Sequence, residues 1–133
     1  MLVDSHCHLD FADFSCDIDD VIARATNAGV KTMLTICTQL SKFYDVHAIA
    51  EKYPNIYCTV GVHPHEAENE SQVTVQKLLE LADRPKVVGF GETGLDFFYN
   101  KSAYDIQEQQ FRTHIEAARE AQLPVIIHTR NAD

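Results

Sequence analysis

Residues 86–96 read KVVGFGETGLD, an apolar run that turns polar at Glu92. The apolar part, residues 86–90, has the length and composition of a buried β-strand. Gly91 and Gly94 then place Glu92 in a loop at the end of that strand. Three other segments repeat the pattern of an apolar run that ends in histidine: LVDSHCH (2–8), IYCTVGVHPH (56–65) and PVIIHTR (124–130). Polar side chains at the carboxyl ends of successive strands are typical of a parallel barrel.

The chain between these segments alternates short apolar runs with longer amphipathic stretches, at a spacing of roughly 30 residues. Neither glycine-rich phosphate-binding pattern follows the first strand, which disfavours a doubly wound nucleotide-binding sheet. The predicted fold class is therefore α/β, an incomplete TIM barrel with about five of its eight βα units. The predicted strands are residues 2–5, 31–36, 56–60, 86–90 and 124–127, and helical spacing is seen in residues 18–25, 75–82 and 111–118.

The composition is that of an ordinary globular protein, with 133 residues, 45% hydrophobic and 23% charged. No apolar run is long enough to cross a bilayer and no leader pattern opens the sequence, so we expect a cytoplasmic protein. The four cysteines are scattered, and we expect buried, reduced thiols. The net charge of −9 disfavours extended binding to duplex DNA. Bound divalent cations could still supply positive charge at a reacting phosphate.

His6-Cys7-His8 comes at the end of the first strand. Residues two apart in a strand point to the same face, so His6 and His8 can converge on one metal ion while Cys7 points toward the helices. Asp4 shares their face, and either orients an imidazole or forms a hydrogen bond within the barrel.

Glu92 and His128 end two further strands of the same predicted barrel. Neutral imidazoles and carboxylates are ligands for zinc, manganese or magnesium, and a carboxylate can bridge two ions because it has two oxygens. We therefore predict that His6, His8, Glu92 and His128 bind metal, with Glu92 in the bridging position.

Four segments that span the chain resemble the signature motifs of the TatD family of metal-dependent deoxyribonucleases: VDSHCHLD (3–10), VGVHPHEA (60–67), GFGETGLDFFY (89–99) and PVIIHTRNAD (124–133). The resemblance implies a TIM-barrel hydrolase in which two divalent ions, bridged by the catalytic Glu92, activate a water that cleaves a phosphodiester bond at a DNA end. It also implies a further histidine after strand six and an aspartate, the general base, after strand eight. Residues 1–133 would then be the N-terminal portion of one such barrel.

His63, Arg130 and Asp96 are the predicted substrate-binding residues. His63 and Arg130 match strand-end loops of the family, where they could contact a phosphate. The other interpretations are a loop histidine braced by Pro64 for His63 and a salt bridge, for example with Asp133, for Arg130. Residues 97–99 either form a wall against a terminal base or belong to the core.

Several polar residues are predicted to have no role in the site. His47 and His114 are expected on helix surfaces, residues 107–110 on an exposed helix face, and the acidic residues of 66–70 in solvent. The role of His65 is left open.

Three other functions compete with a deoxyribonuclease. The first is an ester hydrolase of the same family that acts on D-aminoacyl-tRNA. The second, an amidohydrolase with a bridging lysine, is disfavoured because Lys86 lies at the opposite end of its strand from Glu92. The third is a truncated, non-catalytic product. Five strands cannot close a barrel, so we expect the two edge strands to promote self-association and the 133-residue chain alone to show little nuclease activity.

Overall fold

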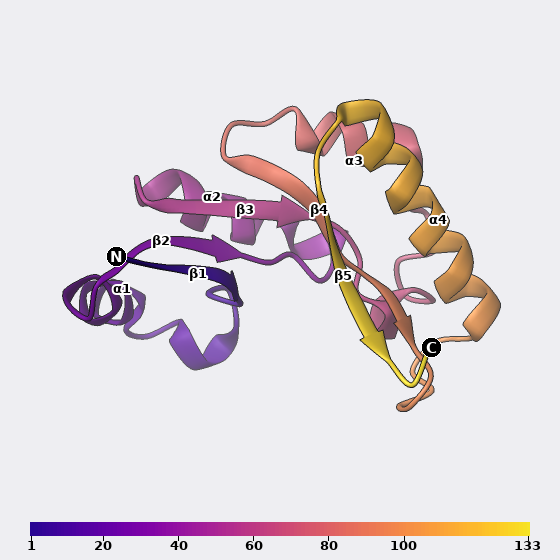
Figure 1. The fold of residues 1–133 in the computed structure, drawn as a ribbon, viewed down its shortest axis with the longest axis horizontal. Coiled ribbons are helices and arrows are strands. Elements are labelled where there is room, and N and C mark those ends of the chain that lie inside the picture. The colour runs from indigo at the N-terminus through magenta and orange to yellow at the C-terminus, as the bar shows by residue number, and fades with distance from the viewer.

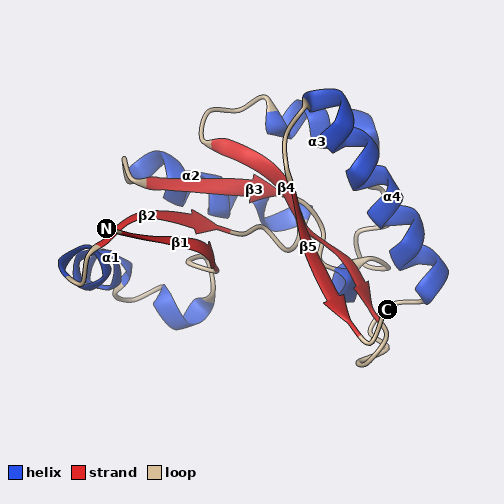
Figure 2. Ribbon diagram, viewed as in Figure 1, coloured by secondary structure: helices blue, strands red, loops and turns tan.

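In the computed structural model, which describes residues 1–133, five strands form a single sheet. The strand order is β1-β2-β3-β4-β5, and all four neighbouring pairs are parallel. Figures 1 and 2 show the sheet curling, with β4 and β5 turned away from the direction of β1 to β3. The fold is therefore an incomplete α/β barrel, as predicted. The strands are β1 (Leu2–Cys7), β2 (Val30–Thr35), β3 (Ile56–Val60), β4 (Val87–Asp96) and β5 (Val125–Arg130).

Four helices connect the strands and pack on one face of the sheet. Figure 1 shows α1 beside β1 and β2, and α3 and α4 side by side next to β4. The helices are α1 (Ile18–Asn27), α2 (Phe43–Lys52), α3 (Val75–Ala82) and α4 (Tyr104–Ala121), with short 3-10 turns η1 (Ala12–Phe14), η2 (Leu40–Lys42) and η3 (Pro64–Glu66). None of these helices is both long enough and apolar enough to cross a membrane.

The core lies between the helices and the sheet. Phe43 of α2 and Phe90 of β4 are completely buried in it, together with Ile56 of β3 and Leu78 of α3. Each of these side chains stabilises the fold by about 1.5–3 kcal/mol relative to an exposed position. The core, which also contains Ala117 and Ala118 of α4, thus holds β3 and β4 against α2, α3 and α4.

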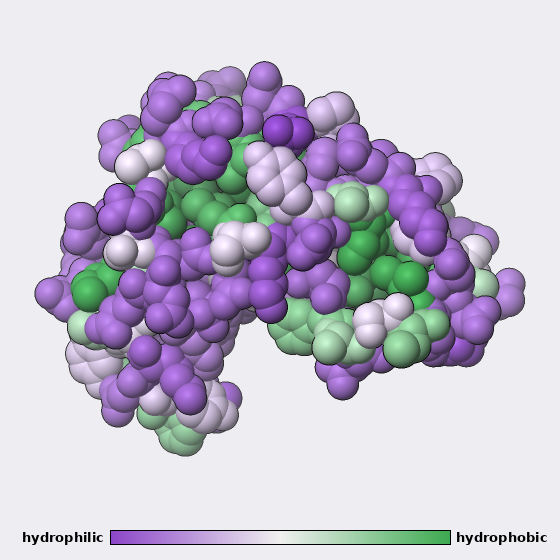
Figure 3. Space-filling model, turned by 180° about the vertical axis from the view of Figure 1, so that it is seen from behind, coloured by the Kyte–Doolittle hydropathy of each residue, from purple (hydrophilic) through white to green (hydrophobic).

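The other face of the sheet is open. Val3, Leu34, Tyr57 and Val88, from the first four strands, line an apolar hollow on it. Figure 3 shows several apolar areas, in green, within a largely hydrophilic face of the molecule. As predicted, β1 and β5 are edge strands that pair with one neighbour only.

The predicted strand ends agree with the structure for β3 and differ most for β4. The prediction ended β4 at Phe90 and placed Glu92 in a loop, but β4 continues through Glu92 to Asp96. This stretch remains a strand because it pairs with β5, in a register that matches Thr93 with Ile127 and Asp96 with Arg130. Gly94 has φ +146°, and a Cβ atom there would collide with the carbonyl oxygen of His128. The glycines that suggested a loop are instead required for the close approach of two strands.

Four predictions of exposed polar residues were wrong. His47 and His114, expected on helix surfaces, are only 4% and 0% exposed, and Gln107 and Gln110 are only 1% and 7% exposed. All four side chains form hydrogen bonds with backbone groups, which offsets the cost of burial.

The cysteines follow the prediction in part. All four are free thiols, and Cys37 and Cys58 are buried, but Cys7 is only partly buried and Cys16 is exposed. Burial raises the pKa of Cys7 and Cys58 to about 12 and that of Cys37 to about 11, so these three thiols stay protonated.

Candidate metal centre

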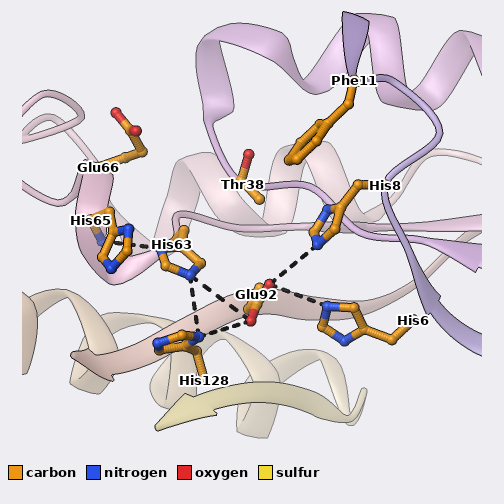
Figure 4. A pocket seen from close by; sticks show the side chains of 9 residues that line it. All are labelled: His6, His8, Phe11, Thr38, His63, His65, Glu66, Glu92 and His128. Carbon is orange, nitrogen blue, oxygen red and sulfur yellow. Dashed lines mark hydrogen bonds and ion pairs between the residues drawn. The ribbon is translucent and has the colours of Figure 1, made fainter. Parts of the chain in front are cut away.

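Glu92 lies at the centre of a group of histidines near the carboxyl ends of the strands (Figure 4). Its Oε2 atom is 3.3 Å from Nε2 of His6 and 3.7 Å from Nε2 of His8. Its Oε1 atom faces the other way, 3.1 Å from Nδ1 of His128 and 4.0 Å from Nε2 of His63. The structure therefore brings the four predicted ligands together, and each carboxylate oxygen faces a different set of imidazoles.

The backbone around Glu92 is held in place by the two preceding strands. The Glu92 N–H donates to the carbonyl of Cys37, which follows β2. Gly61, just after β3, packs so closely on Gly91 that any side chain at position 61 would collide with the backbone there. The buried hydroxyl of Thr59 donates to the carbonyl of Gly91. The carboxylate is thus positioned by rigid neighbouring elements, which favours a fixed coordination geometry.

His6 and His8 approach Glu92 from β1 and the residue just after it. Nδ1 of His8 is 3.2 Å from the carbonyl of Ile36, which can only accept, so this nitrogen carries the proton. The lone pair of Nε2 is then free on the side of Glu92, the state required of a metal ligand. Cys7 points away from Glu92, and its thiol donates to the carbonyl of Leu34.

A second group of imidazoles, from His63, His65 and His128, faces the other oxygen of Glu92. His63 caps η3, and its Nδ1 accepts the backbone N–H of His65. Burial lowers the pKa of His63 to about 4, so its imidazole is neutral. With Nδ1 accepting, the proton is on Nε2, which lies 3.2 Å from Nδ1 of His128.

Asp96 lies beneath this second group and is completely buried. Its Oδ2 is 2.7 Å from Nε2 of His65 and 2.9 Å from Nε2 of His128. Its Oδ1 accepts the backbone N–H groups of Phe98 and Tyr99. Burial acts to raise the pKa of Asp96, but these four hydrogen bonds outweigh burial and hold the pKa well below its usual value. Asp96 is therefore an ionised acceptor that orients two imidazoles.

Arg130, at the end of β5, is exposed, and its guanidinium stacks on an aromatic pair. Its Cζ atom lies 4.4 Å from the ring centre of Phe98 and 4.8 Å from that of Tyr99. Both rings are about half exposed, so they belong to the surface rather than the core. Tyr99 in turn meets the ring of His65 edge-on, with ring centres 5.3 Å apart. Arg130 and the two aromatic residues thus form one continuous surface beside the second imidazole group.

A pocket of about 420 Å³ opens over these groups and is lined by nine residues. Three of them, Phe11, Thr38 and Glu66, were not predicted to belong to the site. Phe11 is the one hydrophobic residue of the lining, and its ring stacks on His8 with the ring centres 4.7 Å apart. Phe11 and Thr38 come from turns after β1 and β2, where the sequence carries no ligand-type residue that would have marked them.

The arrangement of donor atoms fits bound cations. His6, His8 and Glu92 form one group of donors, and His63, His65 and His128 form another, with the ligand atoms of each group within 4.8 Å of one another. The proton positions support this fit. Asp96 takes the proton on Nε2 of His128, which leaves Nδ1 with a lone pair only 3.1 Å from the Glu92 carboxylate. These two acceptors repel each other, and a cation between them would relieve the repulsion and take the lone pair that the Nε2–H of His63 now faces.

The bridging-lysine alternative does not fit the structure. Nζ of Lys86 interacts with the carbonyls of Tyr53, Pro54 and Ile56, at the amino end of β3. Lys86 is therefore held at the end of the sheet opposite to Glu92, as the sequence predicted.

Comparison with known proteins agrees with this geometry. The chain is 38% identical to the 3'-5' ssDNA/RNA exonuclease TatD of Salmonella typhimurium and 39% identical to the uncharacterized metal-dependent hydrolase YcfH of Escherichia coli K12; each match covers 98% of this chain and 50% of the relative. The crystal structure of YjjV, a TatD homologue from Escherichia coli K12, superposes with a TM-score of 0.90 at 36% identity, covering 98% of this chain and 51% of YjjV.

The chain therefore spans about half the length of the relatives that it matches. The family model for TatD related DNase matches residues 3–133, nearly the whole chain. On this match, and with a fold that follows YjjV closely, the chain belongs to the TatD-related DNase family.

Proposed function

We propose that this protein is a metal-dependent hydrolase that cleaves phosphodiester bonds at DNA ends, with His6, His8, Glu92 and His128 holding two divalent cations. The observation that carries the proposal is the position of the Glu92 carboxylate, whose two oxygens face two separate groups of imidazoles. A carboxylate placed in this way can bridge two ions about 3.5–4 Å apart. Zinc, manganese and magnesium are all compatible with nitrogen and oxygen ligands.

Cations bound here would supply an activated water and neutralise the charge that develops on the phosphate oxygens. The chain's own residues bind and orient the substrate. His63 suits this role because its Nδ1 is engaged by the backbone of His65, which leaves the proton on Nε2. A phosphate oxygen would replace Nδ1 of His128, 3.2 Å away, as the acceptor of that proton. Asp96, predicted from sequence as a substrate contact, would act indirectly, since it is completely buried and orients His65 and His128.

Arg130 and its aromatic neighbours are the proposed contact for the strand that leaves the pocket. Arginine offers a fork of donors to phosphate, and exposed aromatic rings stack on unpaired bases of any sequence. Phe98 and Tyr99 present such rings beside the second imidazole group. A single-stranded DNA end is therefore the proposed substrate, and it also suits a protein of net charge −9 that cannot coat a duplex.

We further propose that residues 1–133 form the N-terminal portion of one barrel. The additional histidine and aspartate implied by the family resemblance are not among these residues. The chain alone is therefore expected to bind cations and single-stranded DNA but to hydrolyse DNA very slowly.

The test is a titration of the metal-free 133-residue chain with Mn²⁺ or Co²⁺ by isothermal calorimetry. The unmodified chain should bind two ions, and Glu92→Gln should lose at least one of them because the bridge is gone. Glu66→Gln is the matched control, since Glu66 lines the same pocket but contacts none of the four proposed ligands. A chain that binds no divalent ion, or a Glu92→Gln variant that binds like the unmodified chain, contradicts the proposed metal centre.

The substrate is tested separately, by fluorescence anisotropy of a labelled single-stranded oligonucleotide with and without the metal. Metal-dependent binding of DNA supports the nuclease assignment. Metal-dependent binding of a D-aminoacyl-tRNA without affinity for DNA would instead support the ester hydrolase of the same family.

A further inference from the structure

Three polar side chains of α4 are buried on one face of the helix. Gln107, Gln110 and His114 are 1%, 7% and 0% exposed, and their spacing of three and four residues places them in one row. We call these three residues the α4 polar row. Burying an amide or an imidazole costs free energy unless its polar atoms are hydrogen-bonded, and every side-chain nitrogen and oxygen of the row except Oε1 of Gln110 has a partner.

Gln107 holds the backbone on both sides of the Asp96 side chain. Its Oε1 accepts the Asp96 N–H at 2.8 Å, and its Nε2 donates to the Asp96 carbonyl at 3.1 Å. The same Nε2 donates to the carbonyl of Ser102 at 2.8 Å. The amide therefore fixes both peptide groups of the residue that orients His65 and His128.

His114 holds the segment that carries His63. Its Nδ1 donates to the carbonyl of Gln110 at 2.7 Å, which leaves Nε2 to accept the N–H of Val62 at 3.1 Å. Val62 directly precedes His63 in the chain. Only a neutral imidazole can make both bonds, and burial lowers the pKa of His114 to about 4, which keeps it neutral.

Gln110 holds the same segment farther along. Its Nε2 donates to the carbonyl of Ala67 at 2.6 Å and to that of Glu70 at 3.0 Å. Together with His114, Gln110 fixes the backbone on both sides of the pair His63 and His65. The next turns of α4 bury Ala117 and Ala118 against the apolar core instead, so the polar row is confined to the part of the helix beside the site.

We propose that the α4 polar row consists of positioning residues, which set the places of His63, His65 and Asp96 relative to His128 and thereby the geometry of the second imidazole group. This inference rests on the proposed metal centre. None of the three residues touches a metal or substrate, and each acts through the backbone that it holds. An apolar face in their place would leave the backbone groups of Val62, Ala67 and Asp96 without these partners and both loops free to shift.

The experiment compares two buried histidines that hold different backbone segments, His114 beside the site and His47 away from it. His114→Phe removes the bond to Val62, whereas His47→Phe removes an equally buried imidazole whose Nε2 bonds to the carbonyl of Pro85, in the loop before β4. We measure Co²⁺ affinity and the visible absorption of the bound cobalt, which reports ligand geometry. Loss of partners behind metal ligands typically weakens binding 10–100-fold, and we expect roughly this loss for His114→Phe and Gln107→Leu and no loss for His47→Phe.

His114→Gln is the conservative variant, because its amide oxygen can accept the Val62 N–H, and it should recover most of the affinity. Equal cobalt affinity and equal spectra for His114→Phe and His47→Phe would overturn the proposal. If the unmodified chain binds no cobalt, the metal centre itself fails, and hydrogen exchange then decides the positioning role. Exchange in residues 61–70 and 94–100 should be faster in His114→Phe and Gln107→Leu than in His47→Phe, and equal rates would overturn the inference.

Discussion

Oδ2 of Asp96 lies 2.9 Å from Nε2 of His128, on the side of the imidazole opposite to Glu92. The carboxylate thus fixes which nitrogen of His128 carries the proton and which nitrogen faces the proposed cation. Pairs of a carboxylate and a ligand histidine with this geometry recur in metal sites, where they increase the basicity of the imidazole.

Replacing Asp96 by Asn should therefore weaken metal binding without unfolding the protein. The amide oxygen of Asn can still accept from Phe98 and Tyr99, but its NH₂ group would meet the protonated Nε2 atoms of the two histidines. We expect a loss of about 10–100-fold in Co²⁺ affinity by calorimetry. Asp13→Asn, at an exposed position outside the pocket, is the control, and equal affinity of the two variants would argue against this role.

His114 should make the stability depend on pH. Its pKa is about 4 in the folded protein because burial disfavours the charged form, against 6.5 when exposed. Burial is opposed only by the carbonyl of Gln110, and no charged side chain contributes. Since the folded pKa is the lower one, the contribution of the neutral imidazole is complete above pH 6.5 and is lost as the pH falls toward 4.

Between pH 7 and pH 5 this single group should cost about 2 kcal/mol of unfolding free energy. Urea denaturation at the two pH values measures the loss. The His114→Phe variant lacks the group, so its stability should fall less over this range than that of the unmodified chain. The prediction is wrong if the unfolding free energies of the two proteins change with pH to the same extent.

Arg130→Ala should weaken the binding of single-stranded DNA by about the same factor whatever the DNA sequence. A contact with one phosphate also contributes to the salt dependence of binding, so the slope of log affinity against log salt should fall by about 1. Anisotropy titrations at several salt concentrations give both quantities. Arg112→Ala removes another exposed arginine, paired with Glu108 on α4, and should change neither. If the two variants behave alike, Arg130 does not contact the strand.

The edge strands should cause the isolated chain to associate. Val3 on β1 and Ile127 on β5 are 62% and 59% exposed, beside backbone groups that lack a neighbouring strand. Charged residues on an edge discourage pairing, so Val3→Lys and Ile127→Lys together should shift the chain toward monomer in sedimentation velocity at increasing concentration. If the unmodified chain is monomeric at high micromolar concentration, the edge strands do not promote self-association.

The fold and the grouping of the candidate site residues could be predicted because both depend on local patterns. A strand such as β3 is an apolar run with turn residues on both sides, and its bounds were predicted correctly. His6, His8, Glu92 and His128 could be assigned to one site because the carboxyl ends of parallel strands meet at one edge of the sheet. The length of β4 could not be predicted in this way. A glycine such as Gly94 usually indicates the end of a strand, and here only pairing with β5 makes it part of one.

The supporting side chains were missed for a related reason. Gln107, Gln110 and His114 are ordinary polar residues on an amphipathic helix, and sequence alone assigns such residues to solvent. Their partners are backbone groups of Val62, Ala67 and Asp96, 52, 43 and 11 positions away. A backbone group accepts or donates a hydrogen bond whatever its side chain is. The sequence around Val62, Ala67 and Asp96 therefore could not indicate that residues of α4 bind there.

The cysteines differ in burial, so one of them can be labelled selectively. Thiol reagents attack the exposed thiolate form, and Cys7, Cys37 and Cys58 are protonated, with Cys37 and Cys58 buried and Cys7 partly buried. Cys16 is the one exposed thiol of the chain. A maleimide dye or a nitroxide spin label should therefore attach at a single place without any engineering. Distances from that label to a bound paramagnetic ion or to a dye-carrying oligonucleotide could then be measured on the unaltered chain.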